Sequence, residues 1–255
     1  MISEDLFKID VNVFSSHKTM TQTLINTFRS NGIKARHCHL TQDIGIEHGE
    51  YNEYIERYFH FNENKLKVVS VFRDPLDRMV SSFFQSLSRD VYGRTENERK
   101  ELVDIKESVL FTESMDRIID RFCTYSETID GFGESLHIIC NELNMKINEF
   151  FFDETIGFGH NPHQWCDIYF FRFDILKDNI PSYIKKILNV YVNVKMANIS
   201  KEKWYFNHYK EFSENLKIPR NIIENIYYRR QDIMNVFYKN QIDSIVEEKV
   251  ARYGI

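Results

Sequence analysis

The chain has little of what marks exported, disulfide-bonded or membrane-spanning proteins. It holds four cysteines among 255 residues, with no Cys-x-x-Cys pair, so we expect reduced thiols rather than a disulfide framework. No apolar run approaches the ~18–20 residues that a membrane helix needs, so no membrane span is expected. The first residues include Glu4 and Asp5 where a signal peptide carries a basic region. These absences favour a soluble, cytoplasmic protein.

Proline, glycine and excess charge of one sign are also scarce. The four prolines and nine glycines form no linker, and there is no internal repeat or low-complexity tract, which favours a single domain over residues 1–255. Lys and Arg number 33 against 38 Asp and Glu, for a net charge of −5. This acidic balance argues against nucleic acid as a partner. A net negative charge still allows a local basic pocket.

The hydrophobic pattern predicts an α/β fold. Residues 66–72 (LKVVSVF) are apolar and β-branched, as in a strand covered on both faces. The other expected strands are 9–14, 33–40 and 168–173; the expected helices are 21–30, 51–61, 73–87, 181–188, 221–237 and 241–252, with a mostly helical stretch from about 100 to 150. This alternation predicts three layers, a central parallel sheet flanked by helices, followed by a helical C-terminal part. Ligands of such sheets bind at the carboxyl ends of the strands.

The segment after the first expected strand combines hydroxyls with a lysine. It reads Ser15-Ser-His-Lys-Thr-Met-Thr-Gln-Thr23 and opens a helix. Free backbone N–H groups and the positive dipole end make a helix N-terminus an anion site, and Lys18 adds a mobile cation. Neither a Walker A loop nor a Gly-x-Gly-x-x-Gly fingerprint is present. The alternative interpretation is a plain hydroxyl cap with a surface lysine.

The segment after residues 66–72 combines an arginine with a well-capped helix. Asp74 suits the N-cap and Pro75 the first helical position, which leaves Arg73 at the strand end. Ser81 follows on the same helix. An arginine and a serine so placed can grip a phosphate dianion through charge-assisted hydrogen bonds. The alternative is an ordinary capped helix whose arginines pair with its own acids.

Together the two segments resemble those of sulfotransferases that use 3′-phosphoadenosine-5′-phosphosulfate (PAPS). The resemblance implies a P-loop-like sulfotransferase fold, a catalytic Lys18, and a 3′-phosphate held by Arg73 and Ser81. The residues implied for the phosphosulfate loop are His17, Lys18, Thr19, Met20, Thr21, Gln22 and Thr23. Many family members have glycine where this chain has Met20, so the resemblance also implies a slightly different loop shape.

A third stretch resembles one branch of that family. Residues 198–206 (NISKEKWYF) are similar to the Asn-Lys-Trp-Tyr-Ser motif of the bacterial capsular polysaccharide synthesis family, with the asparagine displaced and phenylalanine in place of serine. By analogy, Lys201 and Lys203 close over the nucleotide. The implied activity is sulfuryl transfer to a hydroxyl of a capsular or surface glycan, with 3′-phosphoadenosine-5′-phosphate (PAP) as the second product. The alternative for Trp204 and Tyr205 is a role as core aromatics.

Sulfuryl transfer needs a general base at the same sheet edge. His37 and His39 close the second expected strand and point to one face of it, because alternate strand residues share a face. His39, nearer the strand end, is the first candidate, His37 the second, and His17 a further one. The alternative for the pair is a structural role.

Two other interpretations stay open. Residues 160–166 (HNPHQWC) read as a metal cluster only if a fourth ligand exists, and none stands at the usual spacing, so no metal is expected. In the sulfotransferase interpretation this segment and residues 171–174 (FRFD) border the acceptor cleft, with Trp165 stacked on a sugar ring. The competing functions are a P-loop-like kinase or nucleotide hydrolase, for which Asp74 is the only obvious Mg²⁺ ligand, and a non-catalytic binding subunit.

Overall fold

The computed structural model describes residues 4–15, 19–38, 45–47, 49–90, 113–128, 134–197 and 205–255. They group into two compact units. The first comprises Met1–Asp74, Phe132–Asn198 and Arg230–Ile242, and the second Pro75–Gly131, Ile199–Arg229 and Asp243–Ile255. The single domain expected from the sequence stays a prediction. No helix within the described ranges is long and apolar enough to cross a membrane.

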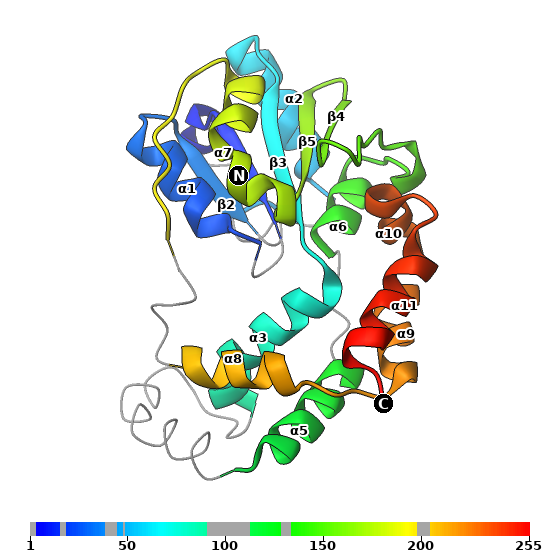
Figure 1. The fold of residues 1–255 in the computed structure, drawn as a ribbon. Coiled ribbons are helices and arrows are strands. Elements are labelled where there is room, and N and C mark those ends of the chain that lie inside the picture. Colours follow the sequence, from blue (N-terminus) through cyan, green and yellow to red (C-terminus); the bar gives the residue numbers. More distant parts are fainter. Residues whose placement is uncertain are drawn as a thin grey trace. The chain divides into compact units, whose positions relative to one another are not determined.

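The first unit is built on a five-stranded sheet in the order β2-β1-β3-β5-β4 (Figure 1). Its strands are β1 (Val11–Phe14), β2 (Ala35–Cys38), β3 (Leu66–Phe72), β4 (Phe158–Pro162) and β5 (Cys166–Arg172). The pairs β1–β2, β1–β3 and β3–β5 are parallel, which confirms the expected parallel core of the sheet. The expectation of a wholly parallel sheet is wrong, because β4 pairs antiparallel with β5. The short turn that joins them leaves room only for a hairpin.

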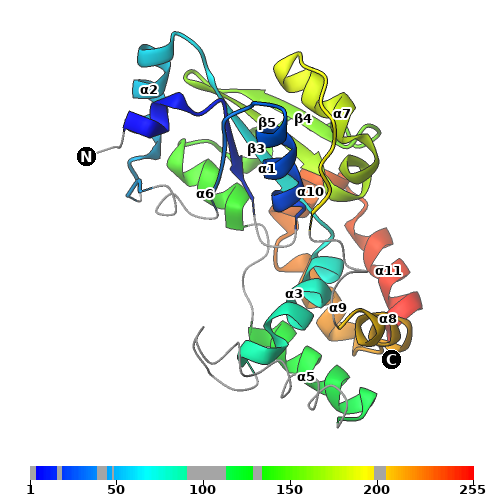
Figure 2. The ribbon, with the colours of Figure 1, turned by 90° about the vertical axis from the view of Figure 1, so that its left-hand side faces the viewer.

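Helices cover both faces of this sheet, as Figure 2 shows from the side. One face packs on α1 (Thr21–Ser30) and α7 (Phe173–Leu188), the other on α2 (Tyr51–Asn62), α6 (Glu134–Glu142) and α10 (Gln231–Tyr238). Alternation along β1 sends Val11 and Val13 to the α1 face and Phe14 to the α2 face. The expected three-layer α/β architecture is therefore confirmed, and α1 has the predicted bounds.

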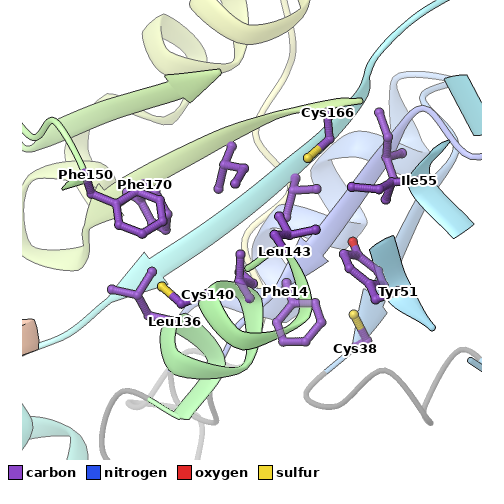
Figure 3. Packing of buried hydrophobic residues seen from close by; sticks show 14 of the residues in the cluster. Phe14, Cys38, Tyr51, Ile55, Leu136, Cys140, Leu143, Phe150, Cys166 and Phe170 are labelled. Carbon is purple, nitrogen blue, oxygen red and sulfur yellow. The ribbon is translucent and has the colours of Figure 1, made fainter. Parts of the chain in front are cut away.

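Large aromatic side chains fill the core on the α2 face (Figure 3). Phe14 and Tyr51 are fully buried there, with edge-on rings whose centroids lie 5.8 Å apart. The four cysteines are free thiols. Burial, with the nearby charge of Asp232, raises the pKa of the Cys140 thiol to about 12. The three buried thiols, Cys38, Cys140 and Cys166, therefore act as apolar core groups rather than nucleophiles.

The second unit is helical throughout its described part. It contains α3 (Pro75–Asp90), α5 (Met115–Thr128), α8 (Phe206–Asn215), α9 (Arg220–Tyr228) and most of α11 (Ile242–Tyr253). Phe84 of α3 packs against Phe212 of α8, and Phe122 of α5 contacts the same ring. The helical C-terminal part is confirmed, but the single helix expected at 221–237 is wrong. It divides at a turn over residues 229 and 230, so α9 and α10 belong to different units.

Two further differences from the expected elements concern the first unit. Helix α7 begins at Phe173 rather than at 181, and it is kinked at the non-helical Asn179, two residues before the internal Pro181. A proline inside a helix kinks it, because it lacks an N–H and its ring clashes with the carbonyl four residues earlier. Short 3-10 turns lie at Glu4–Lys8 and Ile147–Glu149.

Candidate functional site

The candidate site is the switch point of the sheet, at the carboxyl ends of β1 and β3. From β1 the chain moves to β2 on one side and then crosses to β3 on the other, so the order reverses between β1 and β3. In open α/β sheets ligands bind at such a switch point. The register pairs Val13 with Val69, so the loop that leaves β1 and the Arg73 that follows β3 emerge side by side at this edge.

Buried hydroxyls surround the described ends of the loop after β1. Ser15, Thr19 and Thr21 are each less than 10% exposed. The Ser15 and Thr21 hydroxyl oxygens lie 2.7 Å apart, and those of Thr19 and Thr21 lie 3.4 Å apart. Residues 16–18, with His17 and Lys18, fall outside the described residues. The hydroxyl cluster therefore ties together the two ends of the segment that carries Lys18.

Met20 takes the backbone conformation that glycine favours. It is the N-cap of α1, has a φ of 67° in the left-handed region, and makes no side-chain cap hydrogen bond. This conformation costs a residue with a Cβ atom roughly 1–2 kcal/mol. Methionine therefore retains here the backbone shape available to glycine, and such strain is often found at binding sites. The N–H groups of a first helical turn have no partner within the helix, so this end of α1 suits an anion.

The next two residues implied for the phosphosulfate loop, Gln22 and Thr23, lie in the first turn of α1 and differ in exposure. Gln22 is exposed. Thr23 is buried, and its hydroxyl donates to the Ala197 carbonyl at 3.2 Å and accepts from the Ala197 N–H at 3.1 Å. Thr23 thus binds the protein's own backbone beside the first turn of α1. Sequence reasoning missed this partner, which lies far along the chain.

Arg73 is half-buried at the end of β3, and its guanidinium lies over the ring of Phe173, 4.7 Å from the centroid. Planar stacking of this kind holds an arginine in place while its N–H groups keep their fork geometry. Phe173 opens α7, directly after β5; the sequence analysis places it at the border of the acceptor cleft and does not predict its stack on Arg73. Ser81 is half-buried on α3 in the second unit, so its pairing with Arg73 around one phosphate stays a prediction.

A second arginine stands at the same sheet edge. Arg172 ends β5 opposite Phe72 of β3. Its Nε donates to both carboxylate oxygens of Asp174, at 2.9 and 3.1 Å, and its guanidinium lies 5.1 Å from the centre of the Tyr238 ring. The carboxyl ends of β3 and β5 therefore each present an arginine braced by an aromatic ring.

Of the candidate general bases, only His37 lies within the described residues. His37 is half-buried in β2 and is paired in register with Val13 of β1, one residue before the strand ends. His39, the first candidate, lies outside the described residues, as do Lys201, Lys203 and Trp204. Tyr205 packs on Phe84 within the second unit, with ring centroids 5.8 Å apart, which fits its alternative as a packing residue.

Trp165 lies at the other end of the sheet. It precedes β5, and its ring contacts Phe59 and His60 of α2, each with centroids 5.3 Å apart. Because β5 is parallel to β3, Trp165 lies at the amino edge of the sheet, opposite the edge where Arg73 follows β3. Its expected place beside an acceptor cleft stays a prediction. His160 stacks on Tyr169 at 4.6 Å. Across the described ranges no group of three or more His, Cys, Asp or Glu side chains is placed to hold a metal ion.

This edge of the sheet thus brings together a helix N-terminus, hydroxyls and a braced arginine, which are groups of the kind that suit phosphate or sulfate esters. Comparisons of the chain with protein-family models, with curated proteins and with solved structures found no match. The assignment of function therefore depends on the chemistry of this edge and on the motifs that lie there.

Proposed function

We propose that this protein is a PAPS-dependent sulfotransferase that acts on a hydroxyl of a capsular or surface glycan, in a P-loop-like variant of the three-layer fold. One observation carries the proposal. β1 and β3 are neighbours on either side of the switch point, so both motif-bearing segments leave the sheet at one edge. The 5′-phosphosulfate binds the loop that holds Lys18, and the 3′-phosphate binds Arg73 with Ser81.

The reaction is a single displacement at sulfur. The acceptor hydroxyl oxygen forms a bond to sulfur while the bond from sulfur to the bridging phosphate oxygen breaks. The hydroxyl proton passes to His39 or His37, and Lys18 stabilises the charge that develops on the leaving phosphate. The N–H groups at the start of α1 neutralise the sulfuryl oxygens. The work is positioning and electrostatics, which side-chain cations can perform.

The placement of Arg73 supports this division of roles. Its stack on Phe173 holds the guanidinium in place before the nucleotide arrives. A cation already held pays less conformational entropy on binding than a free side chain does. The strained Met20 backbone at the N-terminus of α1 fits the same requirement for a preformed loop.

The first test is isothermal titration of the full chain with PAP and with AMP, which lacks the 3′-phosphate. We expect PAP to bind at micromolar concentrations and AMP at least about 30-fold more weakly, because a buried charge pair that loses one partner costs roughly 2–5 kcal/mol. Equal affinities would remove Arg73 and Ser81 from the site. No PAP binding at millimolar concentration would refute the proposal.

The second test is catalytic. With ³⁵S-labelled PAPS and a capsular oligosaccharide as acceptor, the wild-type protein is expected to transfer label, and Lys18→Ala is expected to abolish transfer while PAP still binds. Retained transfer in the variant would exclude Lys18 from the mechanism. Magnesium-dependent turnover of ATP, measured as phosphate release, would instead establish the kinase or hydrolase alternative.

A further inference from the structure

Helix α1 carries a row of polar side chains where an apolar face would be expected. Thr23, Thr27 and the C-cap residue Asn31 are spaced four residues apart, so they line one side of the helix. Thr23 and Thr27 are buried and Asn31 is half-buried. The chain that follows α7 runs alongside α1 in both views (Figures 1 and 2).

Each polar side chain in the row bonds the backbone of that neighbouring segment. The Thr23 hydroxyl bonds both the N–H and the carbonyl of Ala197. The Thr27 hydroxyl accepts from the Lys195 N–H at 3.0 Å. The Asn31 side chain accepts from the Asn193 N–H at 3.1 Å and donates to the Asn193 carbonyl at 3.0 Å. We call these three contacts the α1 ladder.

The spacing of the ladder follows from the geometry of its two sides. Four helical residues rise about 6 Å, and two extended residues span about 6.6 Å. A helix side chain every fourth position therefore meets an extended backbone every second position, with the two running in opposite directions. The side chains of α1 thus bond backbone N–H and carbonyl groups of this segment that would otherwise need a neighbouring strand as partner.

The other side of the segment is held by apolar contacts. Val192 is buried against the α1 face of the sheet, and the half-buried Val194 packs on the same core cluster. The ladder and these two valines fix the segment from both sides. The chain consequently leaves Ala197 next to Thr23, in the first turn of α1, at the edge where the hydroxyl cluster lies.

We infer that the α1 ladder is a positioning device for nucleotide binding and that Thr27, at its centre, is a positioning residue. It fixes the position of Ala197 beside the first turn of α1, the end proposed to bind the anion. Thr23 accordingly acts through Ala197 rather than as a direct ligand. The inference rests on the proposed function, since it concerns the same nucleotide.

The test compares Thr27→Val, which removes the hydroxyl at nearly constant volume, with Thr27→Ser, which keeps it. Thr124→Val is the matched control, because the exposed Thr124 hydroxyl on α5 donates to the Asp120 carbonyl of its own helix at 3.2 Å and touches no ladder residue among the hydrogen bonds described for it. We expect Thr27→Val to speed hydrogen exchange at the Lys195 amide at least tenfold and to weaken PAP binding about tenfold. Both values return toward wild type in Thr27→Ser, and Thr124→Val changes neither.

A purely structural Thr27 would speed exchange and lower the melting temperature while leaving PAP affinity unchanged, and that result would overturn the inference. Unchanged exchange at Lys195 would overturn the ladder itself. Should Thr27→Val fail to fold, Asn31→Ala breaks the peripheral contact, and exchange at Asn193 with PAP affinity gives the same decision. If the wild-type protein binds no PAP, the proposed function is refuted. The hydrogen-exchange data alone do not test the proposed function.

Discussion

Helices α1 and α2 follow neighbouring parallel strands and begin at the same edge of the sheet, but their N-termini are completed differently. At α2 the buried carboxylate of Glu142, from α6, accepts from the Gly49 N–H at 3.0 and 3.1 Å and from the Tyr51 N–H at 3.3 Å. At α1 the N-cap is a strained Met20 with no side-chain cap bond. The fold therefore supplies its own anion to one helix and surrounds the other with hydroxyls. This contrast supports the proposal that α1, rather than α2, is the helix whose N-terminus binds an anion from outside.

The comparison of the two helix N-termini is tested most strongly by removing the cation beside the N-terminus of α1. Arg73→Ala is expected to weaken PAP binding about 100-fold, because a phosphate loses a charge-assisted, fork-shaped donor. Lys67→Ala is the control, since Lys67 pairs with Asp167 at 2.6 Å near the amino end of β3 and is expected to leave PAP affinity unchanged. Isothermal titration decides. Equal losses in the two variants would mean that binding follows overall charge.

The α2 end is tested through stability rather than binding. Glu142→Gln replaces one acceptor oxygen with an amide donor that faces the same backbone N–H groups. We expect the free energy of unfolding in urea to fall by about 2 kcal/mol, the cost of leaving a buried donor unsatisfied. PAP affinity is expected to hold. Glu248→Gln, an exposed carboxylate on α11, is expected to change stability by less than about 0.5 kcal/mol. A Glu142→Gln protein of wild-type stability would contradict the internal-anion role.

The strain at the α1 end is measured by two truncations at one position. Met20→Gly and Met20→Ala both lose the methionine side chain, so their difference reports the backbone. We expect the glycine variant to be more stable by about 1 kcal/mol, since only alanine retains the Cβ penalty at positive φ. Arg57 is exposed inside α2. There we expect the alanine variant to be more stable than the glycine variant, because glycine destabilises a helix interior relative to alanine. Thermal unfolding of the four variants supplies both differences.

The smallest expected effect concerns another carboxylate, Asp167, at the amino edge of the sheet. Burial alone would raise the pKa of Asp167, but the hydrogen bond and charge of Lys67, with His160, hold it below its usual value of 3.8. A depressed folded pKa adds stability that is fully present above pH 3.8 and is lost as pH falls through the folded value. Asp167→Asn is therefore expected to remove a few tenths to about 1 kcal/mol at pH 7 and less at pH 3. Equal effects at both pH values in urea titrations would exclude a charge-based role.

Local patterns predicted the elements whose side chains repeat regularly. The amphipathic run of α1 and the apolar run of β3 have the bounds that their residues indicate. Strand β4 was missed because its sequence, FGHNP, has residues that favour turns and forms a strand only by pairing with β5. The first half of α7 was missed because Phe173 extends the apolar run of β5.

The site residues divide in the same way. The hydroxyls near Lys18 and the arginine before Asp74 carry a local signal, since they stand between a strand and a helix. Phe173 and Glu142 carry none, because an aromatic ring or a carboxylate becomes a brace or a cap only when a distant segment lies against it. Thr27 offered a weak signal, as a polar residue on a helix face that otherwise faces the core.

By itself, the amino-acid sequence determined the α/β alternation and placed the anion-binding residue types in the loops after β1 and β3. Side-chain periodicity and turn chemistry act over a few residues, so they can be read directly from the chain. The tertiary structure alone decided that β1 and β3 are neighbours, that Glu142 completes α2, and that α1 holds the backbone at Ala197. These contacts join segments far apart in the chain, and their free energy appears only when the whole core assembles.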